Sequence, residues 1–124
     1  LSDRYTVSTQ KSSVFWTSEQ GNKRLKPDII LTDKSNHERK IILDTKWKLP
    51  SNKMPSDQDL RQMFAYNRLF DSTRSMLLYP GPEESIKGTY QTEYGGSCRV
   101  VLWPVVDEEG RLVGDARMVE SIYT

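Results

Sequence analysis

The sequence predicts an α/β (α+β) fold with a mixed central β-sheet flanked by helices. Three segments of strand character come first, one amphipathic helical segment follows, and two further strand segments come after it. The order β-β-β-α-β-β implies a mixed sheet. A chain of 124 residues can bury one core of useful size, so we expect a single domain over residues 1–124.

Three strands are expected before the helical segment. Residues 12–17 form the first, and a Gly-Asn turn signal follows at 21–22. Residues 26–32 form the second, and the polar stretch 33–38 then turns the chain. Residues 39–48 form the third strand, which is rich in β-branched and aromatic residues.

The strongest helix signal spans residues 56–71. Ser56 is a favourable N-cap, and Asp57 and Asp59 suit the positive end of the helix dipole. Apolar side chains at helical spacing give this helix one apolar face; they are Leu60, Met63, Phe64 and Phe70.

Two strands are expected after the helix. Residues 74–79 predict an apolar strand closed by a Pro-Gly-Pro turn, and residues 99–106 predict another. A turn at 109–110 and a terminal helix near 116–121 are expected in the tail. The chain begins with Leu1 rather than methionine, so we expect it to be a fragment of a longer chain.

The composition excludes several kinds of protein and metal site. No apolar run approaches the roughly 18 residues of a membrane span, and no signal peptide opens the chain, so we expect a cytoplasmic protein without a membrane partner. Cys98 is the single cysteine and His37 the single histidine, which excludes a disulfide framework and any cysteine- or histidine-based metal cluster. A metal bound here is therefore expected to be a hard cation with oxygen ligands.

The charge is distributed unevenly along the chain. Residues 1–54 carry a formal charge of +5 and residues 55–124 a charge of −4, which gives +1 for the whole. A moderately basic half permits an anionic partner such as DNA, but taken alone it is more typical of an ordinary solvated surface.

The most informative residues are two aspartates and a lysine on successive strands. Side chains alternate along a strand, so Asp44 and Lys46 project from the same face. If the preceding turn is centred on Asn36, antiparallel partners have numbers that sum to 72, and Asp28 lies opposite Asp44. Directly opposed residues share a face with their Cβ atoms about 4.5–5.5 Å apart. Two carboxylates at that spacing repel, so a shared proton, the Lys46 ammonium or a divalent cation must compensate.

This arrangement is suited to metal-assisted hydrolysis of a phosphodiester. Asp28 and Asp44 would hold Mg²⁺, and Lys46 would orient or activate the attacking water or stabilise the negative charge of the transition state. Each fragment also has an ordinary structural interpretation, because Pro-Asp is a common turn dipeptide and Asp-Thr-Lys suits an exposed, salt-bridged strand. A register shift of one residue would destroy the site.

The helical segment contributes a polar stripe. Asp59, Gln62 and Tyr66 fall at i, i+3 and i+7 and therefore share one side of the helix. Gln62 and Tyr66 are long enough to reach a metal-bound water, a carboxylate or a DNA phosphate. The alternative is a plain amphipathic helix with a half-buried tyrosine.

Together these residues resemble the PD-(D/E)xK nucleases. The pattern consists of Pro27-Asp28, then Asp44-Thr45-Lys46, then Gln62 and Tyr66 on a helix, as in the RecB-like branch of that superfamily. Segments 26–31, 41–48, 59–66 and 77–80 are more specifically similar to the McrC family, the nuclease subunit of the McrBC restriction system. The similarity covers residues 25–80, with a weaker likeness at 100–105.

The resemblance implies a restriction-endonuclease-like core and an Mg²⁺-dependent DNA endonuclease, with Mn²⁺ as a possible substitute. It assigns catalysis to Asp28, Asp44, Lys46, Gln62 and Tyr66, and metal binding to Asp28, Asp44 and the backbone carbonyl of Thr45. It also implies cleavage of modified-cytosine DNA together with an AAA+ GTPase motor of the McrB type. This chain has no phosphate-binding loop of the motor kind, so it is not expected to be the motor itself. The long N-terminal region through which the McrC family engages its motor is missing here, so the resemblance implies a C-terminal catalytic domain.

Two alternatives stay open. Besides the McrBC-type endonuclease, the sequence is compatible with a non-catalytic, nuclease-like module for DNA binding or assembly, and with a RecB-like nuclease of another DNA-processing system. The resemblance also has a gap, because superfamily members often carry a further acidic residue before the first motif strand. Only Glu19 is available for that role here.

Overall fold

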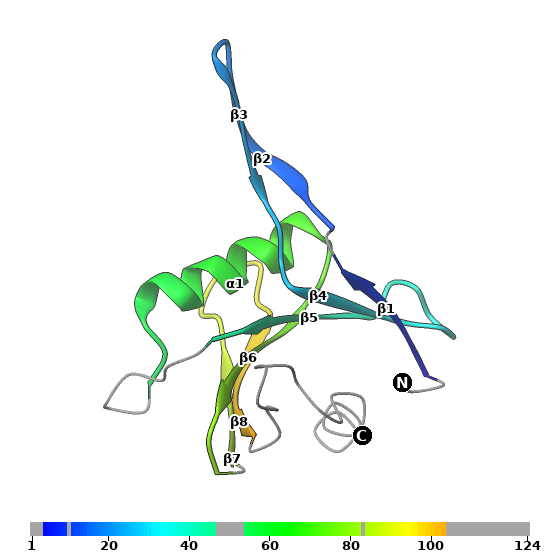
Figure 1. Ribbon diagram of the computed structural model, residues 1–124, viewed down its shortest axis with the longest axis vertical. Coiled ribbons are helices and arrows are strands. Elements are labelled where there is room, and N and C mark those ends of the chain that lie inside the picture. Colours follow the sequence, from blue (N-terminus) through cyan, green and yellow to red (C-terminus); the bar gives the residue numbers. More distant parts are fainter. Residues whose placement is uncertain (1–3, 10, 47–53, 83, 104–124) are drawn as a thin grey trace.

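The computed structural model describes residues 4–9, 11–46, 54–82 and 84–103. It has a mixed six-stranded sheet with one helix, α1, lying across one face, and a separate two-stranded hairpin (Figure 1). The elements are β1 Tyr5–Thr9, β2 Ser13–Ser18, β3 Gly21–Leu25, β4 Ile29–Asp33, β5 Lys40–Thr45, α1 Asp57–Leu69, β6 Arg74–Pro80, β7 Glu84–Thr89 and β8 Ser97–Trp103. The predicted fold class is confirmed, although α1 is the sole flanking helix within the described residues.

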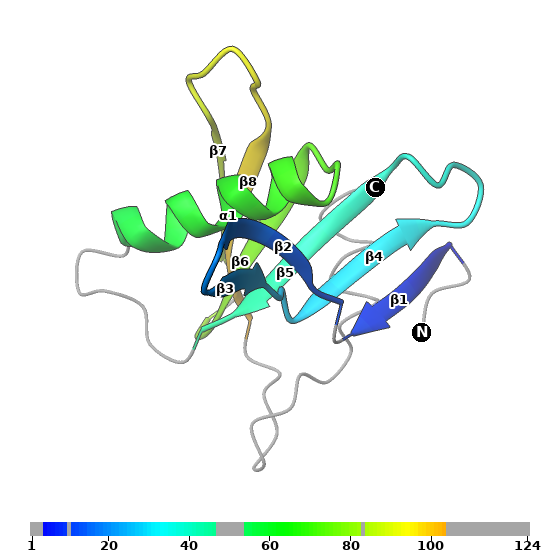
Figure 2. The same cartoon turned by 90° about the horizontal axis from the view of Figure 1, so that it is seen from above.

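The six-stranded sheet has the order β1-β4-β5-β6-β8-β7. β5, β6 and β8 are parallel, and α1 forms the crossover from β5 to β6. β4 and β1 continue the sheet as antiparallel strands on one side, and β7 closes the other side as an antiparallel edge. Figure 2 shows α1 lying over the centre of this sheet.

The central strands are buried on both faces, which explains their near-continuous apolar sequences. Ile41 and Leu43 belong to one core cluster, and Ile42 belongs to the second cluster, on the face covered by α1. The second cluster includes Met63 and Tyr66 of the helix, and these two side chains are 0% and 3% exposed. The alternation predicted for β5 is therefore confirmed, and the Asp44 side of the strand faces the helix.

The predicted register of the β4–β5 hairpin is confirmed. Ile29 pairs with Leu43, Ile30 with Ile42, Leu31 with Ile41 and Thr32 with Lys40, so every pair sums to 72. The loop between the strands is polar, and the amide of Arg39 donates to the carbonyl of Asn36. Apolar residues in both strands fix this alignment, because a slip of one residue would turn them toward the wrong face.

The helix begins where the sequence predicts. The Ser56 hydroxyl accepts a hydrogen bond from the amide of Asp59 at 3.0 Å, and Asp57 and Asp59 occupy the first turn. The carbonyl of Tyr66 accepts the last helical bond from Phe70. In the part of the chain that the structure describes, no helix is long and apolar enough to cross a membrane.

Three strands were not predicted: β1, β3 and β7. β3 and β7 have little apolar pattern, whereas β1 directs Tyr5 and Val7 to a core cluster. β1 and β7 lie at the two edges of the large sheet, and β7 is exposed along its whole length. The turn expected at 21–22 is wrong, because Gly21 already begins β3 and the turn is formed by residues 19–20. Gly21 has a φ of 141°, a conformation that favours glycine.

Several predicted boundaries are also corrected. The strand expected over 26–32 is β4 and begins at Ile29, and the strand expected from 99 is β8 and begins at Ser97. The last residues predicted for the strands 39–48 and 99–106 lie outside the described residues. So do the turn at 109–110 and the helix near 116–121.

Candidate active site

The predicted site residues converge at the carboxyl end of β5. Asp44 is the last buried residue of β5, at 6% exposure. Asp28 immediately precedes Ile29, the first residue of β4. Continued by one position beyond Ile29 and Leu43, the register that sums to 72 places Asp28 opposite Asp44, and Asp28 itself lies in a bend just before β4. The amide of Asp28 donates a hydrogen bond to Oδ1 of Asp44 at 3.4 Å, which brings the two aspartates together at this end of the hairpin.

The Asp28 carboxylate also joins the two strands. Its Oδ2 accepts hydrogen bonds from the amide of Thr45 at 2.8 Å and from the hydroxyl of Thr45 at 2.7 Å. The N–H and C=O of one residue in an extended strand point to the same side. The carbonyl of Thr45 is therefore directed toward the Asp28 side of β5.

Lys46 connects the two strands to the helix. Its Nζ lies 2.9 Å from Oδ2 of Asp44 and 3.5 Å from Oδ1 of Asp59, and it donates a hydrogen bond to Oε1 of Gln62 at 3.0 Å. The side chain of Lys46 is 24% exposed, so the ammonium is held by the protein and still reaches the surface. Asp44 and Lys46 therefore share a face, as the alternation of side chains along the strand predicts.

Gln62 and Tyr66 extend this contact into a chain of hydrogen bonds along the helix. Nε2 of Gln62 donates to Oη of Tyr66 at 3.0 Å, and Oη of Tyr66 donates to the carbonyl of Lys26 at 3.4 Å. A lysine can only donate and a backbone carbonyl can only accept. The two ends therefore fix the direction of every bond between them and the orientation of the Gln62 amide.

The electrostatic environment differs for the two charged groups of β5. Burial is the largest influence on Asp44 and raises the pKa of its carboxyl; the hydrogen bond from Lys46 opposes this shift, and the charge of Asp28 adds to it. Burial lowers the pKa of Lys46, but the hydrogen bond and charge of Asp44, together with the charge of Asp59, raise it above its ordinary value overall. Lys46 is therefore a cation at neutral pH.

Tyr66 remains a neutral donor. Burial raises the pKa of its phenol to about 12, with contributions from the charges of Asp44 and Asp28. The hydroxyl therefore keeps the proton that it donates to the carbonyl of Lys26.

The donor set fits a hard divalent cation. Asp28, Asp44 and Asp59 carry three negative charges against the single positive charge of Lys46, so the ionised cluster has a charge of −2. Carboxylate and carbonyl oxygens are the ligands that Mg²⁺ prefers. Within the described residues, no group of three or more histidine, cysteine or acidic side chains is placed to hold a metal. The predicted ligand set has two carboxylates and one backbone carbonyl, which is fewer side-chain ligands than such a group contains.

Two acidic residues need separate mention. Asp59 was recognised in the polar stripe but not as a site residue, and it contacts both Lys46 and the hydroxyl of Tyr79. The available signal was its position as the third residue of the helix, three residues before Gln62 and therefore on the same side. Glu19 lies in the turn between β2 and β3, outside this cluster.

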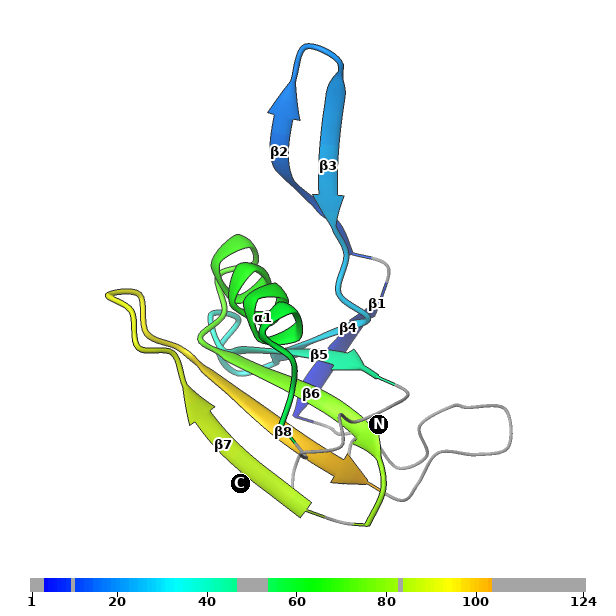
Figure 3. The ribbon, with the colours of Figure 1, turned by 90° about the vertical axis from the view of Figure 1, so that its left-hand side faces the viewer.

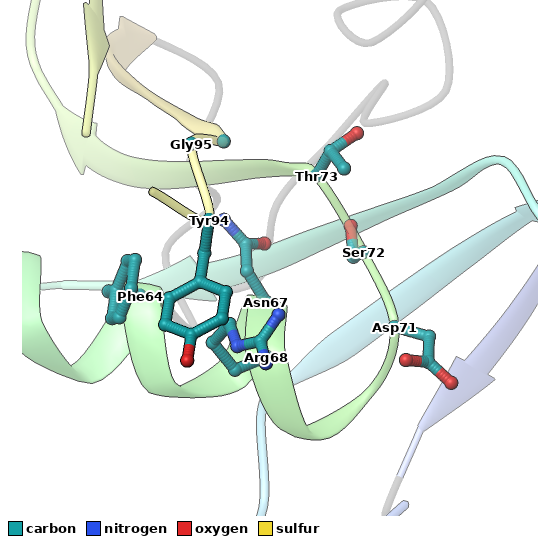
Figure 4. Close-up of a pocket in the computed structure, with 9 residues that line it drawn as sticks. Phe64, Asn67, Arg68, Asp71, Ser72, Thr73, Tyr94 and Gly95 are labelled. Atoms are coloured by element: carbon teal, nitrogen blue, oxygen red, sulfur yellow. The ribbon is translucent and has the colours of Figure 1, made fainter. Parts of the chain in front are cut away.

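A surface hollow of about 200 Å³ lies at the other end of the helix (Figure 4). Arg68 stacks on the ring of Tyr94 there, with 3.7 Å from the guanidinium carbon to the ring centroid. The buried Oδ1 of Asn67 has no hydrogen-bond partner among the described residues. None of the predicted site residues lines this hollow, so it is separate from the aspartate–lysine cluster.

The sheet order and the helical crossover define a domain of the restriction-endonuclease-like fold. Among solved structures, the chain is similar to one from the refined half-complex of a tetradecameric assembly of Thermococcus gammatolerans McrB AAA+ hexamers with bound McrC. The TM-score is 0.64 and the sequence identity 15%, over 97% of this chain and 29% of that one. The present chain therefore spans less than a third of that protein's length.

The chain belongs to the McrBC family. Residues 1–80 match the family described as "McrBC 5-methylcytosine restriction system component". The matched region contains Asp28, Asp44 and Lys46 together with Gln62 and Tyr66. A search of curated proteins found no match.

Proposed function

We propose that this chain is the Mg²⁺-dependent DNA endonuclease domain of a McrBC-type restriction system. The observation that supports this most strongly is the convergence of Asp28, Asp44 and Lys46 at one end of the β4–β5 hairpin. Membership of a 5-methylcytosine restriction family favours DNA that carries modified cytosine as the substrate.

The metal would be held by Asp28, Asp44 and the carbonyl of Thr45. These oxygen donors and the net charge of −2 suit Mg²⁺, and Mn²⁺ is expected to substitute for it. Bound Mg²⁺ supplies Lewis acidity toward the scissile phosphate and lowers the pKa of a coordinated water. The hydrogen bonds from Thr45 to Asp28 hold that carboxylate in a fixed orientation before any metal arrives.

Lys46 acts as a cation rather than as a base. Its pKa is raised, so it carries a proton that it can donate to the phosphate oxygens or to the attacking water. The reaction adds negative charge to the phosphate, and a pre-positioned ammonium stabilises that charge more in the transition state than in the ground state.

Gln62 and Tyr66 position Lys46. The Gln62 carbonyl holds one donor of the ammonium, and Tyr66 and the Lys26 carbonyl hold Gln62 in turn. These three hydrogen bonds therefore restrict the flexible side chain of Lys46 to one location beside Asp44, which lowers the entropy lost on reaching the transition state.

The motor function is assigned to a partner. The 124 residues contain no Gly-x-x-x-x-Gly-Lys-Ser/Thr loop, and the similar solved structure contains McrB AAA+ hexamers with bound McrC. We therefore propose an AAA+ GTPase of the McrB type as the partner that supplies DNA to this site.

Cleavage of 5-methylcytosine DNA by the full-length protein with its motor, GTP and Mg²⁺ tests the proposal. Asp44→Asn and Lys46→Ala should each reduce cleavage at least about 100-fold. The matched controls Asp71→Asn and Lys87→Ala, on exposed residues, should cut normally. Equal melting temperatures of all variants would show that folding is intact.

Two results would overturn the assignment. Unchanged cleavage in both site variants would remove these residues from the chemistry. A wild-type complex that binds modified DNA but never cuts it would favour the non-catalytic module instead. Calorimetric titration with Mg²⁺ adds an independent measurement, because Asp44→Asn should weaken binding whereas Asp71→Asn should not.

A further inference from the structure

The β2–β3 hairpin projects away from the rest of the domain. It forms its own two-stranded sheet, and Figure 3 shows it extending beyond α1, with β3 leading into the start of β4. Near its middle it exposes two large aromatic side chains, Phe15 at 53% and Trp16 at 55%. Exposing adjacent aromatic side chains on a projecting element has no benefit for the core, so they are candidates for contact with a ligand.

The pairing within the hairpin brings a cation beside the exposed tryptophan. The register shifts between Val14 and Trp16, which leaves Phe15 as the extra residue of a bulge. After the bulge, Trp16 pairs with Lys23, and directly paired residues share a face. A bulge re-aims side chains and increases the local twist. One face of the hairpin therefore presents an aromatic ring and an ammonium side by side.

The hairpin is positively charged along its length. Residues 11–26 contain four cations and one acid, Glu19, which gives a net charge of +3. The cations are all exposed; they are Lys11, Lys23, Arg24 and Lys26. Arg24 donates hydrogen bonds to the hydroxyl and carbonyl of Ser12, which are neutral, and no carboxylate of the described residues forms an ion pair with these four cations. The positive charge is therefore available to a partner.

The base of the hairpin is attached to the candidate active site. The carbonyl of Lys26 accepts the hydrogen bond from Tyr66, and Leu25 packs against the core cluster that contains Tyr66. Asp28 follows two residues after Lys26. Lys23 lies five positions before Asp28, a span of at most about 17 Å in extended chain. This distance corresponds to about five base pairs of duplex DNA.

We propose that the β2–β3 hairpin is a DNA-binding arm that holds the duplex next to the cleaved phosphate. The cations contact backbone phosphates, and Trp16, with Phe15 beside it, packs against sugars or bases in a groove. This inference rests on the proposed nuclease function and extends it by naming the surface that binds the substrate within about five base pairs of the cut. A net charge of +3 favours DNA over a protein partner as the occupant.

DNA binding by the full-length protein tests the arm. Fluorescence anisotropy with a labelled 30-base-pair duplex, in Ca²⁺ to prevent cleavage, gives Kd at several salt concentrations. The double variant Trp16→Ala, Lys23→Ala should weaken binding by about tenfold or more. Its slope of log Kd against log salt should also fall by about one, because one phosphate contact is lost. The control double variant Ile86→Ala, Lys87→Ala makes the same charge change on exposed β7. Its Kd for the duplex should stay within about twofold of the wild-type Kd.

Two single variants refine the interpretation. Lys23→Glu leaves the aromatic side chains in place and should lower both the affinity and the salt slope, even if the double variant proves unstable. Trp16→Phe retains an aromatic ring and should keep most of the affinity. It should also lose the part of the tryptophan fluorescence quenching on DNA addition that arises from Trp16.

The outcomes separate this inference from the proposed function. Equal DNA affinity in the hairpin variants and wild type would overturn the proposal of a DNA-binding arm. If Asp44→Asn lost cleavage in the same experiments, the nuclease proposal would still stand. Unchanged DNA affinity with lost binding to a partner protein would identify a protein-docking surface and also overturn the arm. Weaker DNA binding in the hairpin variants, with no cleavage by the wild-type complex, would support the arm and reject the nuclease.

Discussion

The ammonium nitrogen of Lys46 lies 3.0 Å from the side-chain oxygen of Gln62, which links the end of β5 to the second turn of α1. The contact depends on two independent features of the sequence. The alternation along β5 sends Lys46 toward the helix, and the capped start at Ser56 sets which helical side chains face the strand. Neither feature alone places the lysine, so the site arises where the strand and the helix meet.

Gln62→Leu should lower the catalytic rate without weakening DNA binding. The substitution removes the bonds to Lys46 and Tyr66 but keeps a side chain of similar size. A hydrogen bond to a charged group is worth about 1.5–3 kcal/mol, which corresponds to a loss of about 10- to 100-fold in kcat. Steady-state cleavage should show this loss with KM unchanged. Gln58→Leu, on the exposed side of the same helix, is the control; equal rates for the two variants would contradict the positioning role.

The sequence predicts the β4–β5 register because three physical constraints agree there. The apolar residues of both strands require one alignment, the polar loop sets the turn, and Asp28 and Asp44 follow at the open end. The helix is equally well specified, because a strong N-cap and a periodic apolar face coincide. In both elements the local signals, a turn or an N-cap, favour the same structure as the burial of apolar side chains in the core, and this agreement makes the elements predictable.

The rest of the sheet is specified by tertiary pairing rather than by sequence pattern. β7 is exposed throughout, and it is held by backbone pairing with β8 rather than by apolar side chains of its own. β1 differs from β7, because it pairs with β4 and also directs Tyr5 and Val7 to a core cluster, so its alternation of apolar and polar residues is a sequence signal that the prediction did not use. The contact between Asp59 and Lys46 also depends on how the helix crosses the strand, which the spacing of residues along one element does not determine.

Ser56→Ala should destabilise the domain by about 1 kcal/mol, because the amide of Asp59 loses its acceptor. A loss of this size lowers Tm by about 4 °C in a domain of this length. Ser56→Asp restores an acceptor and adds a favourable charge at the helix N-terminus, so it should melt close to wild type. If Ser56→Ala melted at the wild-type temperature, the cap would contribute nothing to the helix that carries Gln62 and Tyr66.

Asp33→Asn should destabilise the protein near neutral pH and make little difference in strong acid. Hydrogen bonds from the hydroxyl and amide of Ser35, followed by the charge of Arg4, lower the pKa of Asp33 from 3.8 to about 2. A carboxyl with a lowered pKa in the folded state stabilises the protein above its unfolded pKa, and this contribution disappears as the pH falls from about 4 to about 2. Urea unfolding at pH 6 and pH 3 should therefore show the difference between variant and wild type shrinking with acid. A difference that stayed constant or grew would contradict the shift.

Asp28→Asn should lower the pKa of Asp44 and weaken Mg²⁺ binding at the same time. The negative charge of Asp28 is one of the influences that raise the pKa of Asp44, and the neutral amide removes it while still offering an oxygen to Thr45. The carboxyl carbon of Asp44, followed by NMR through a pH titration, should shift at lower pH in the variant. Calorimetry should show weaker Mg²⁺ binding, because one anionic ligand is lost. Asp71→Asn makes the same chemical change on an exposed residue at the other end of the helix, at a φ of 55° that asparagine tolerates, and should alter neither quantity. An unchanged Asp44 titration in Asp28→Asn would mean that the two carboxylates do not interact, and the shared metal site would then lose its physical basis.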